Sequence, residues 1–575
     1  MRWLLRKTDP NTVDALSRDA ALSPVIAALL AARGIITPDS AHAFLNPSLD
    51  QLHSPFLMSG LRAAVERLRA AIDRNETIFI YGDYDVDGTT AIVILKTALE
   101  LCGGRVEFHV PHRIREGYGM RDEVIAQAAA SGVRLIISVD TGIRAFAAAE
   151  AAARCGVDLI VTDHHLPQAD GVPKALAVVN PNQPGCQYPC KSLCGAGVAF
   201  KIAQALLEAT GRQRLLPSFL KIVAIATIAD AVPLIGENRI FAKLGLDGLR
   251  DPRNPGLKAL LATCQLDGSR PLSAGDIAFR VAPRLNAAGR MDVAQRVIDL
   301  FTEKDEARAA EMAMRLNELN GDRQLAEQKI LDEIYRQIDD TPEWKEAYSL
   351  VAAGDGWHRG VIGICATRVV ERYHRPALVF SCENGEAHGS GRSIEAFHLL
   401  DALESCPELF TRYGGHSHAV GCALPVERLP ELRARLEAYA RQHLTPLDFI
   451  PILDYDCELS LDEVNQRLWE SLAGLEPFGA GNPRPMFVAR GVRLLQPPRV
   501  IKDIHLKLRV GEGSPNGATR RPQDVVGWRM AERARSESLV VGDRLDLAFT
   551  VDYNTHPDFG GVQLTLSDFA RTIGS

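Results

Sequence analysis

The sequence predicts an α/β protein with a mainly parallel sheet, a second α/β domain joined to it by long helices, and a small C-terminal β-barrel. Strand-like and helix-like segments alternate from residue 76 onward, which is typical of a parallel sheet covered by helices. Residues 293–344 hold helical apolar spacing, and residues 448–575 hold short strand-like runs typical of a barrel. We therefore expect domains at residues 76–292, 345–447 and 448–575, with connecting helices at 293–344.

The composition is that of an ordinary soluble globular protein. The chain has 575 residues, 46% hydrophobic and 24% charged, which as a prior indicates roughly four domains. No apolar run approaches the length of a membrane span, and the N-terminus lacks a secretory apolar core, so we expect a cytoplasmic protein without membrane partners. The net charge of −7 argues mildly against nucleic acid as a partner, although a metal-holding carboxylate cluster would inflate the acidic count.

The eleven cysteines are scattered, and we expect reduced thiols. Cys186, Cys190 and Cys194 form the one cluster, but their spacing fits no common zinc pattern. Three incidental thiols explain it better than a metal site.

Residues 1–75 have helical apolar spacing at 13–20, 24–33, 40–45 and 61–74, with Ser23 and Asp39 as caps. We interpret them as a helical N-terminal subdomain without catalytic residues.

The main functional signal lies at residues 77–90, where a buried strand runs into Asp83, Asp85 and Asp87 and then directly into a helix. This arrangement places the carboxylates at the C-terminal edge of the sheet, where open α/β sheets bind ligands. Like charges so close together repel unless a cation lies among them, and a hard divalent cation is the usual one. The alternative is an acidic surface turn.

The same pattern recurs in later strands. Residues 134–140 form a strand ending in Asp140, and residues 157–163 form one ending in Asp163, followed by the pair His164 and His165. Asp230 closes an apolar stretch that fits either a helix or a strand. Because parallel strands end at one edge, these side chains should converge, which an acidic surface turn does not explain.

The motifs GDYDVDG, VDTG, TDHH and ATIAD, in this order, resemble the four signature motifs of the DHH phosphoesterase superfamily. Within it, PHRIREGYG at 111–119, PRLNAAGR at 283–290, GVIGI at 360–364 and LEPFGAGNP at 475–483 resemble RecJ single-strand-specific exonucleases. The resemblance covers nearly the whole chain. It implies a DHH domain, a DHH-associated domain and an OB-fold. Some superfamily members have a histidine at the position of Tyr81, so we expect a ligand role there to pass to Asp83.

The second α/β domain contains two glycine-rich segments, GSGRS at 389–393 and YGGHSHAVG at 413–421. Glycine-rich turns allow close approach of phosphate oxygens, and Arg392 offers a fork of donors. A purely structural turn is the alternative. By resemblance to the DHH-associated domain, Ser390, Arg392, Gly415 and His416 hold the terminal phosphate of the substrate.

The barrel is expected from strands at 486–488, 505–510, 525–528, 544–551 and 561–566, with a mobile loop at 511–523. An OB-fold binds single strands through a basic groove and stacking rings. The candidates are Lys502, His505, Lys507, Arg509 and Trp528; cations on a strand face can equally be solvated.

The resemblance implies hydrolysis with two divalent ions, Mn²⁺ or Mg²⁺. It makes Asp140 a bridging ligand, with Asp85 on one ion and Asp87, His164 and Asp230 on the other, and Asp83 a ligand or a support. His165 would contact the phosphoryl group, and Asp163 would orient His164 or His165 through a ring N–H.

The resemblance also implies the direction of attack. Arg113, Arg284, Asn286 and Arg290 would contact the phosphate backbone, in a cleft between the two α/β lobes that admits one strand. Holding the 5′ end gives 5′ to 3′ degradation to mononucleotides, in DNA recombination and repair. We expect a monomer that works with a helicase and a single-stranded-DNA-binding protein. The alternatives are a phosphodiesterase for oligonucleotides or cyclic dinucleotides, and a non-catalytic nucleic-acid-binding scaffold.

Overall fold

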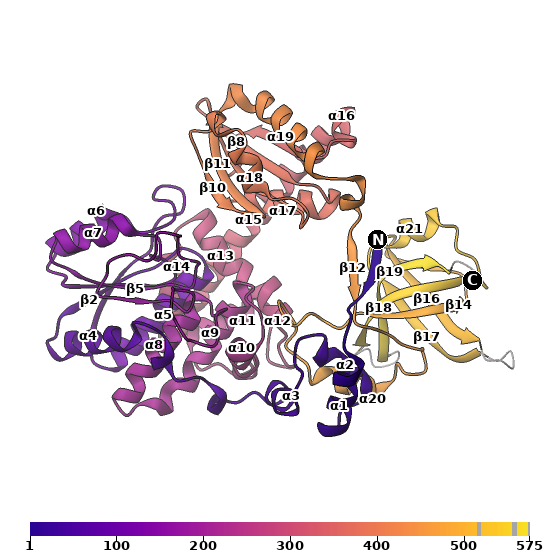
Figure 1. Cartoon of the computed structure of the whole chain (residues 1–575), viewed down its shortest axis with the longest axis horizontal. Coiled ribbons are helices and arrows are strands. Elements are labelled where there is room, and N and C mark those ends of the chain that lie inside the picture. Colours follow the sequence, from indigo (N-terminus) through magenta and orange to yellow (C-terminus); the bar gives the residue numbers. More distant parts are fainter. Residues whose placement is uncertain (514–518, 555–559, 573–575) are drawn as a thin grey trace. The chain divides into compact units, whose positions relative to one another are not determined.

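The computed structural model describes residues 1–513, 519–554 and 560–572 (Figure 1). The chain divides into two compact units. The smaller unit comprises Met1–Leu52, Pro233–Lys243 and Ile452–Ser575, and the larger unit comprises His53–Val232 and Leu244–Pro451.

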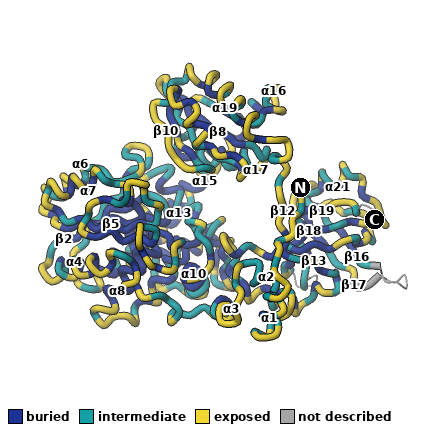
Figure 2. Tube along the Cα trace, viewed as in Figure 1, coloured by how far each residue is buried: buried dark blue, intermediate teal, exposed yellow. Residues whose placement is uncertain are grey.

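The larger unit begins with the predicted parallel sheet, in the strand order β3-β2-β4-β5-β6. The strands are β2 (Thr77–Tyr81), β3 (Arg105–His109), β4 (Leu135–Ser138), β5 (Asp158–Thr162) and β6 (Ala177–Val179). Their helices are α4 (Leu61–Asp73), α5 (Val86–Leu101), α6 (Asp122–Ala130), α7 (Phe146–Arg154) and α8 (Gly195–Ala209). Helices α6 and α7 pack on one face around Tyr81 and Ile136, and the buried β5 lies between β4 and β6 (Figure 2). All five strands therefore end at one edge.

A helical region follows the sheet. It contains α9 (Leu220–Ala229), α10 (Gly236–Gly248), α11 (Pro255–Thr263), α12 (Ala274–Asp276), a π-helix (Ile277–Val281), α13 (Ala282–Met291), α14 (Gln295–Thr302), α15 (Glu306–Asp340) and α16 (Pro342–Lys345). The apolar stretch before Asp230 is thus a helix, and Asp230 is its C-cap. Helix α15 spans 35 residues and continues through Gly321 without a break.

The second α/β domain contains a five-stranded mixed sheet in the order β10-β11-β9-β8-β7. Its elements are β7 (Leu350–Asp355), α17 (Ile362–Tyr373), β8 (Ala377–Glu383), β9 (Glu386–Arg392), α18 (Leu399–Glu404), β10 (Arg412–His416), β11 (Ala419–Pro425) and α19 (Leu429–His443). The two glycine-rich segments, expected as turns, belong largely to the paired strands β9, β10 and β11. Glycine suits these strands because a Cβ at Gly389 would lie 2.2 Å from the Phe380 ring, and one at Gly391 2.5 Å from Leu378.

The smaller unit joins both ends of the chain. Its elements are β1 (Arg2–Leu5), α1 (Pro10–Asp19), α2 (Pro24–Ala31), α3 (Pro38–Leu45), β12 (Ile452–Tyr455), β13 (Cys457–Glu458), α20 (Gln466–Ala473), β14 (Phe487–Leu494), β15 (Arg499–Ile501), β16 (His505–Gly513), β17 (Thr519–Gly527), α21 (Ala531–Ser536), β18 (Arg544–Asn554) and β19 (Gly561–Arg571). Leu16, Leu29 and Phe44 share one apolar core with Phe487 and Phe549 of the barrel. The expected subdomain at 1–75 is therefore divided: its first 52 residues pack on the barrel, while α4 packs on the parallel sheet.

The barrel strands run in the order β13-β14-β18-β19-β17-β16-β15. A further pairing of β14 with β16, at Leu494 and Val510, joins strands that are not neighbours in this order and curls the sheet into a partial ring. The loop expected at 511–523 is shorter than that interval, because β16 extends to Gly513 and β17 begins at Thr519; residues 514–518 lie outside the described residues. Within the described part of the chain, no helix has both the length and the hydropathy needed to cross a bilayer.

Candidate active site

Four segments bring carboxylates and imidazoles together at the C-terminal edge of the parallel sheet. They are the turn from β2 into α5, the residues after β4, the residues after β5, and the end of α9. Among the described residues, three groups have ligand atoms within 4.8 Å of one another. The groups are Asp83, Asp85 and Asp140; Asp87, His164 and Asp230; and Asp140, His164 and His165. None of these groups contains a cysteine.

Local backbone geometry fixes the first two carboxylates. Asp85 is the N-cap of α5, and its Oδ1 accepts a hydrogen bond from the Gly88 N–H at 2.9 Å. Asp87 accepts from the N–H groups of Gly195 at 2.5 Å and Ala196 at 2.8 Å, so the first turn of α8 points at it. A helix N-terminus stabilises a negative charge. Position 195 requires glycine, because a Cβ there would lie 2.5 Å from the Asp140 Cβ.

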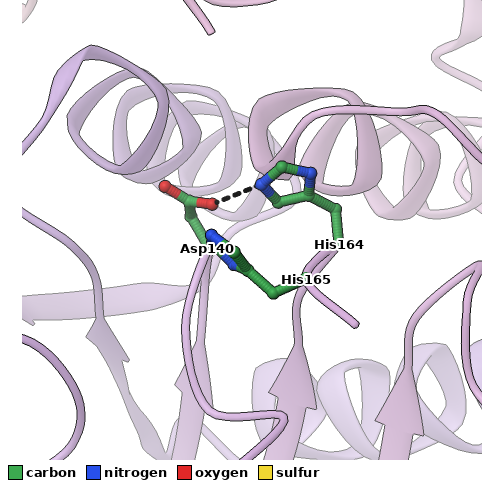
Figure 3. A group of neighbouring side chains, drawn as sticks. All are labelled: Asp140, His164 and His165. Atoms are coloured by element: carbon green, nitrogen blue, oxygen red, sulfur yellow. Dashed lines mark ion pairs between the residues drawn. The ribbon is translucent and has the colours of Figure 1, made fainter. Parts of the chain in front are cut away.

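Asp140 lies at the centre of the site. It is 2% exposed and adopts a left-handed backbone conformation at φ 58°, which aspartate and asparagine tolerate better than most residues. Its Oδ1 lies 3.2 Å from His164 Nε2 without forming a hydrogen bond, and Figure 3 shows the two side chains facing each other. Burial, and next the charge of Asp87, raise the pKa of Asp140 well above its ordinary value.

The pKa values of three other carboxyl groups are raised for the same reasons. Burial, followed by the charge of Asp85, raises the pKa of Asp83 from 3.8 to about 8. Burial, followed by Asp87, raises the pKa of Asp230 to about 8 and also raises that of Asp85. Such shifts mean that several buried negative charges face one another without a compensating cation.

The two histidines differ in protonation. Burial lowers the pKa of His164, which favours the neutral imidazole that metals bind. Its Nε2 lies 3.8 Å from both Asp87 and Asp230. Burial also opposes the charge on His165, but a hydrogen bond between its Nδ1 and Asp163 Oδ1 at 2.7 Å outweighs it and raises the pKa. Of the two orientations considered for Asp163, the structure shows the one toward His165.

Two buried carboxylate oxygens, Asp83 Oδ1 and Asp140 Oδ1, have no hydrogen-bond partner. An unsatisfied buried acceptor is costly, and a divalent cation would satisfy both. The oxygen-only group around Asp85 and the mixed group around His164 each suit a hard or borderline ion. The residues therefore fit a metal centre with Asp140 adjacent to both groups. The Tyr81 hydroxyl donates to the Gly119 carbonyl, whereas Asp83 belongs to one of the potential ligand groups.

Three arginines form a positive cluster near these carboxylates. Burial, then repulsion from Arg113, lowers the pKa of Arg290 to about 10 and also lowers that of Arg392. Arg290 donates to the Gly360 carbonyl at 2.9 Å, and Arg392 to Ser390 Oγ at 3.2 Å and the Gly391 carbonyl. None of the three forms an ion pair with a carboxylate among the described residues. Half-buried, mutually repelling cations of this kind suit an anionic ligand such as phosphate.

A cavity of about 620 Å³ adjoins the two histidines. Tyr118, Ile143, Phe146 and His165 line it, and His416 lies on its wall. The Tyr118 hydroxyl lies 3.4 Å from His165 Nδ1. The cavity therefore has apolar walls beside the His165 ring, which is hydrogen-bonded to Asp163.

The remaining predicted residues belong to none of the three potential ligand groups. Arg284 donates to Asn317 Oδ1 at 2.9 Å, and Asn286 is partly exposed on α13. Gly415 adopts a positive φ of 144° next to His416 at the end of β10. In the barrel, Lys507 pairs with Asp524 at 3.0 Å, and Trp528 is 59% exposed with its ring edge-on to His505.

The sequence analysis missed two asparagines whose side chains fix the backbone of His164 and His165. Asn180 Nδ2 donates to the His165 carbonyl at 2.9 Å, and Asn182 Nδ2 to the His164 carbonyl at 2.7 Å. Both follow the end of β6, so the strand-end rule that selected the aspartates would also have found them.

Comparison with known protein families identifies three domains. Residues 77–227 match the N-terminal domain of the DHH family, residues 346–442 match the DHHA1 domain, and residues 455–568 match the RecJ OB domain. These intervals contain the parallel sheet, the mixed sheet and the barrel, respectively.

Individual proteins resemble the chain along most of its length. A single-stranded-DNA-specific exonuclease RecJ of Bacillus subtilis is 36% identical, with 99% of this chain and 71% of the relative covered. The crystal structure of RecJ from Thermus thermophilus in complex with Mn²⁺ covers 100% of this chain and 80% of its own, at 29% identity and a TM-score of 0.84. The structure of RecJ in complex with Mg²⁺ from the same organism matches with a TM-score of 0.78 at 28% identity, covering 100% of this chain and 79% of its own.

Proposed function

The chain belongs to the RecJ family of single-stranded-DNA-specific exonucleases, and on this basis we propose that it degrades single-stranded DNA from the 5′ end to mononucleotides. The observation that carries the proposal is the juxtaposition of two potential ligand groups next to Asp140 with a cluster of half-buried arginines. The carboxylates fit metal ions, and the arginines fit the phosphates of the strand.

Asp83, Asp85 and Asp140 would hold one divalent ion, and Asp87, His164 and Asp230 the other, as Mn²⁺ or Mg²⁺. When bound, two such ions activate the attacking water and offset negative charge on the phosphoryl oxygens. Asp140 lies next to both groups, which supports a bridging role. Asp87 is held rigidly by the first turn of α8, so the ligand geometry is preorganised.

The other residues position the substrate and the proton donors. Asp163, itself fixed by the Ile143 N–H, keeps the His165 ring in one orientation and favours its protonated form. His165 can then donate to a phosphoryl oxygen and stabilise the charge that develops there. Asn180 and Asn182 act as positioning residues, because they fix the carbonyls of the two histidines.

Arg392 and Ser390 would hold the 5′-phosphate, and Arg113 and Arg290 the next phosphate toward the carboxylates. Arg113 lies over the Tyr84 ring at 4.8 Å, and the charges of Arg113 and Asp85 act on each other, which supports a place for it beside the metal-binding groups. An anchored 5′ end beside the site of hydrolysis would impose 5′ to 3′ polarity.

We expect Arg392→Ala to raise KM for 5′-phosphorylated single strands by about tenfold or more, because a hydrogen bond to a charged group contributes about 1.5–3 kcal/mol. Strands with a 5′-hydroxyl should change little. Arg428→Ala is the control, since Arg428 lies on the same domain, exposed and paired with Glu431. Equal losses on both kinds of strand would contradict an end-binding role.

The barrel would hold the strand further from the cleaved end. We expect Trp528→Ala to weaken binding of long single strands by roughly fivefold or more, because stacking of a base contributes about 1–3 kcal/mol. Lys507 should matter less, since it pairs with Asp524, which it shares with Arg509. Fluorescence anisotropy with Val541→Ala as an exposed control in the same unit measures the effect. Unchanged affinity would show that Trp528 is not part of the DNA-binding surface. Deleting the barrel is a poor test, because residues 1–52 share its core.

The overall test is digestion of end-labelled DNA with manganese or magnesium. The proposal requires mononucleotides released from the 5′ end of single strands, with duplexes resistant. A chain that hydrolyses dinucleotides much faster than long strands would be an oligonucleotide phosphodiesterase instead.

We also propose the setting in which the enzyme acts. A nuclease limited to single strands needs another protein to separate a duplex, so we propose a helicase and a single-stranded-DNA-binding protein as partners, in DNA recombination and repair. We propose a cytoplasmic monomer. Light scattering with and without a single strand measures its oligomeric state.

A further inference from the structure

Phe279 is 82% exposed, more than any other large apolar side chain among the described residues. It lies on the π-helix Ile277–Val281, between α12 and α13. Single π-turns inside helices are rare and are frequent at functional sites. Exposing a phenylalanine ring is unfavourable in water, so this ring is suited to a partner that covers it.

The helical segment from α12 to α13 leads from Phe279 toward the arginine cluster. Exposed or half-buried positions recur along it every three or four residues and so form one open stripe: Gly275, Phe279, Pro283, Asn286 and Arg290. Arg290, at the far end, belongs to the positive cluster. With a rise of about 1.5 Å per residue, Phe279 lies about 16 Å from Arg290 along the helix.

The end of this stripe at Arg290 packs against the turn between β2 and α5, which carries Asp83 and Asp85. A Cβ at Gly289 would lie 2.4 Å from the carbonyl oxygen of Tyr84, between Asp83 and Asp85. Arg290 is hydrogen-bonded to Gly360. A strand held at the arginines could therefore continue along α13 toward Phe279.

The charge around Phe279 suits a polyanion. Arg270 and Arg280 both pair with Asp276, at 2.6 and 3.4 Å, and Arg284 one turn further has no carboxylate partner among the described residues. Three arginines thus face two aspartates, Asp276 and Asp267, which leaves a net positive segment around an exposed ring. Basic side chains interleaved with an aromatic ring are the usual composition of single-strand binding surfaces.

We propose that Phe279 is a stacking platform for one base of single-stranded DNA, a few nucleotides 3′ of the bond that is cleaved. This inference rests on the proposed function and adds a binding position outside the catalytic centre and the barrel. The ring stacks on the base. Asn286, in the same stripe, and Arg284, one turn beyond Arg280, contact the neighbouring phosphates. Because every base has a flat apolar face, the platform accepts any sequence.

The test compares Phe279→Ala, Phe279→Leu and Phe279→Trp with the parent in binding 5′-phosphorylated oligothymidylates of increasing length, with Ca²⁺ to slow hydrolysis. Alanine and leucine should each lower the affinity for long strands by about tenfold, and tryptophan should preserve it. The difference should grow with strand length. Leu447→Ala, an exposed apolar side chain elsewhere in the same unit, is the control.

An abasic site moved along the strand locates the platform. In the parent it should weaken binding at one position, and at that position it should have no further effect in Phe279→Ala. Parental affinity in the leucine variant would overturn the inference, because it would show that the contact does not require an aromatic ring. Unchanged affinity in the alanine variant would also overturn it.

The parent protein separates the two possible failures. If the parent itself neither binds nor hydrolyses single strands, the proposed function fails. If the parent is active and only these differences are missing, the stacking platform alone fails. Thermal midpoints check that the exposed position leaves the fold intact.

Discussion

Asp140→Asn should lower hydrolysis of single-stranded DNA by at least about 10³-fold while leaving strand binding nearly unchanged. Metal ions supply several kcal/mol of transition-state stabilisation, and each 1.36 kcal/mol corresponds to a factor of ten in rate. Asp140 is adjacent to both potential ligand groups, so its loss affects both. Asparagine keeps the volume and tolerates the left-handed backbone at φ 58°, which alanine would strain.

The matched control is Asp158→Asn, at the opposite end of the adjacent strand β5, where the carboxylate pairs with Arg67 at 2.6 Å. It should keep parental activity. In the presence of a chelator, Asp140→Asn should also unfold at a higher temperature than the parent, because one of several buried like charges is gone. Manganese-dependent hydrolysis at the parental rate in Asp140→Asn would refute the assigned site.

Removing the metal should make stability strongly dependent on pH. In the metal-free protein the pKa values of Asp83 and Asp230 are raised from 3.8 to about 8, so between about pH 4 and pH 8 the folded state binds more protons than the unfolded state. The slope of the unfolding free energy with pH is then negative, and stability falls as pH rises through this window. Thermal unfolding in a chelator near pH 5 and near pH 8 measures it.

Manganese should reverse this trend, since it replaces the protons and binds the charged carboxylates. The increase in melting temperature on adding manganese should therefore be larger near pH 8 than near pH 5. Asp140→Asn should flatten the slope measured in the chelator. A metal-free protein equally stable at both pH values would show that the carboxylates carry no such repulsion.

The strand-end carboxylates could be predicted because a local pattern was sufficient. An apolar run ending in an aspartate, repeated at Asp85, Asp140 and Asp163, defines both the strand and the edge at which it ends. Asp230 could not be assigned, because α9 is buried on nearly all sides and so lacks the periodicity that distinguishes a helix from a strand. Whether Asp163 orients His164 or His165 also required the structure, since adjacent histidines have the same sequence signal.

The glycine-rich strands β9 and β10 were expected as turns because glycine is unfavourable in strands on local grounds. Contacts distant in sequence decide otherwise: at Gly389 and Gly391 the side chains of Phe380 and Leu378 occupy the space a Cβ would need. The shared core of the N-terminal helices and the barrel is a similar case. Leu29 and Phe487 belong to one apolar core although hundreds of residues separate them in the chain, and no local pattern indicates this.

The joining of the two chain ends in the smaller unit has a consequence for biosynthesis. A ribosome releases the first 52 residues long before Ile452–Ser575, yet Leu16, Leu29 and Phe44 belong to the same apolar core as that last segment. The apolar faces of helices α1 to α3 therefore stay exposed to solvent and chaperones until the last segment has been synthesised. The parallel sheet, in contrast, can fold as it emerges from the ribosome. Premature termination before residue 452 would leave these helices without their partner and prone to aggregate.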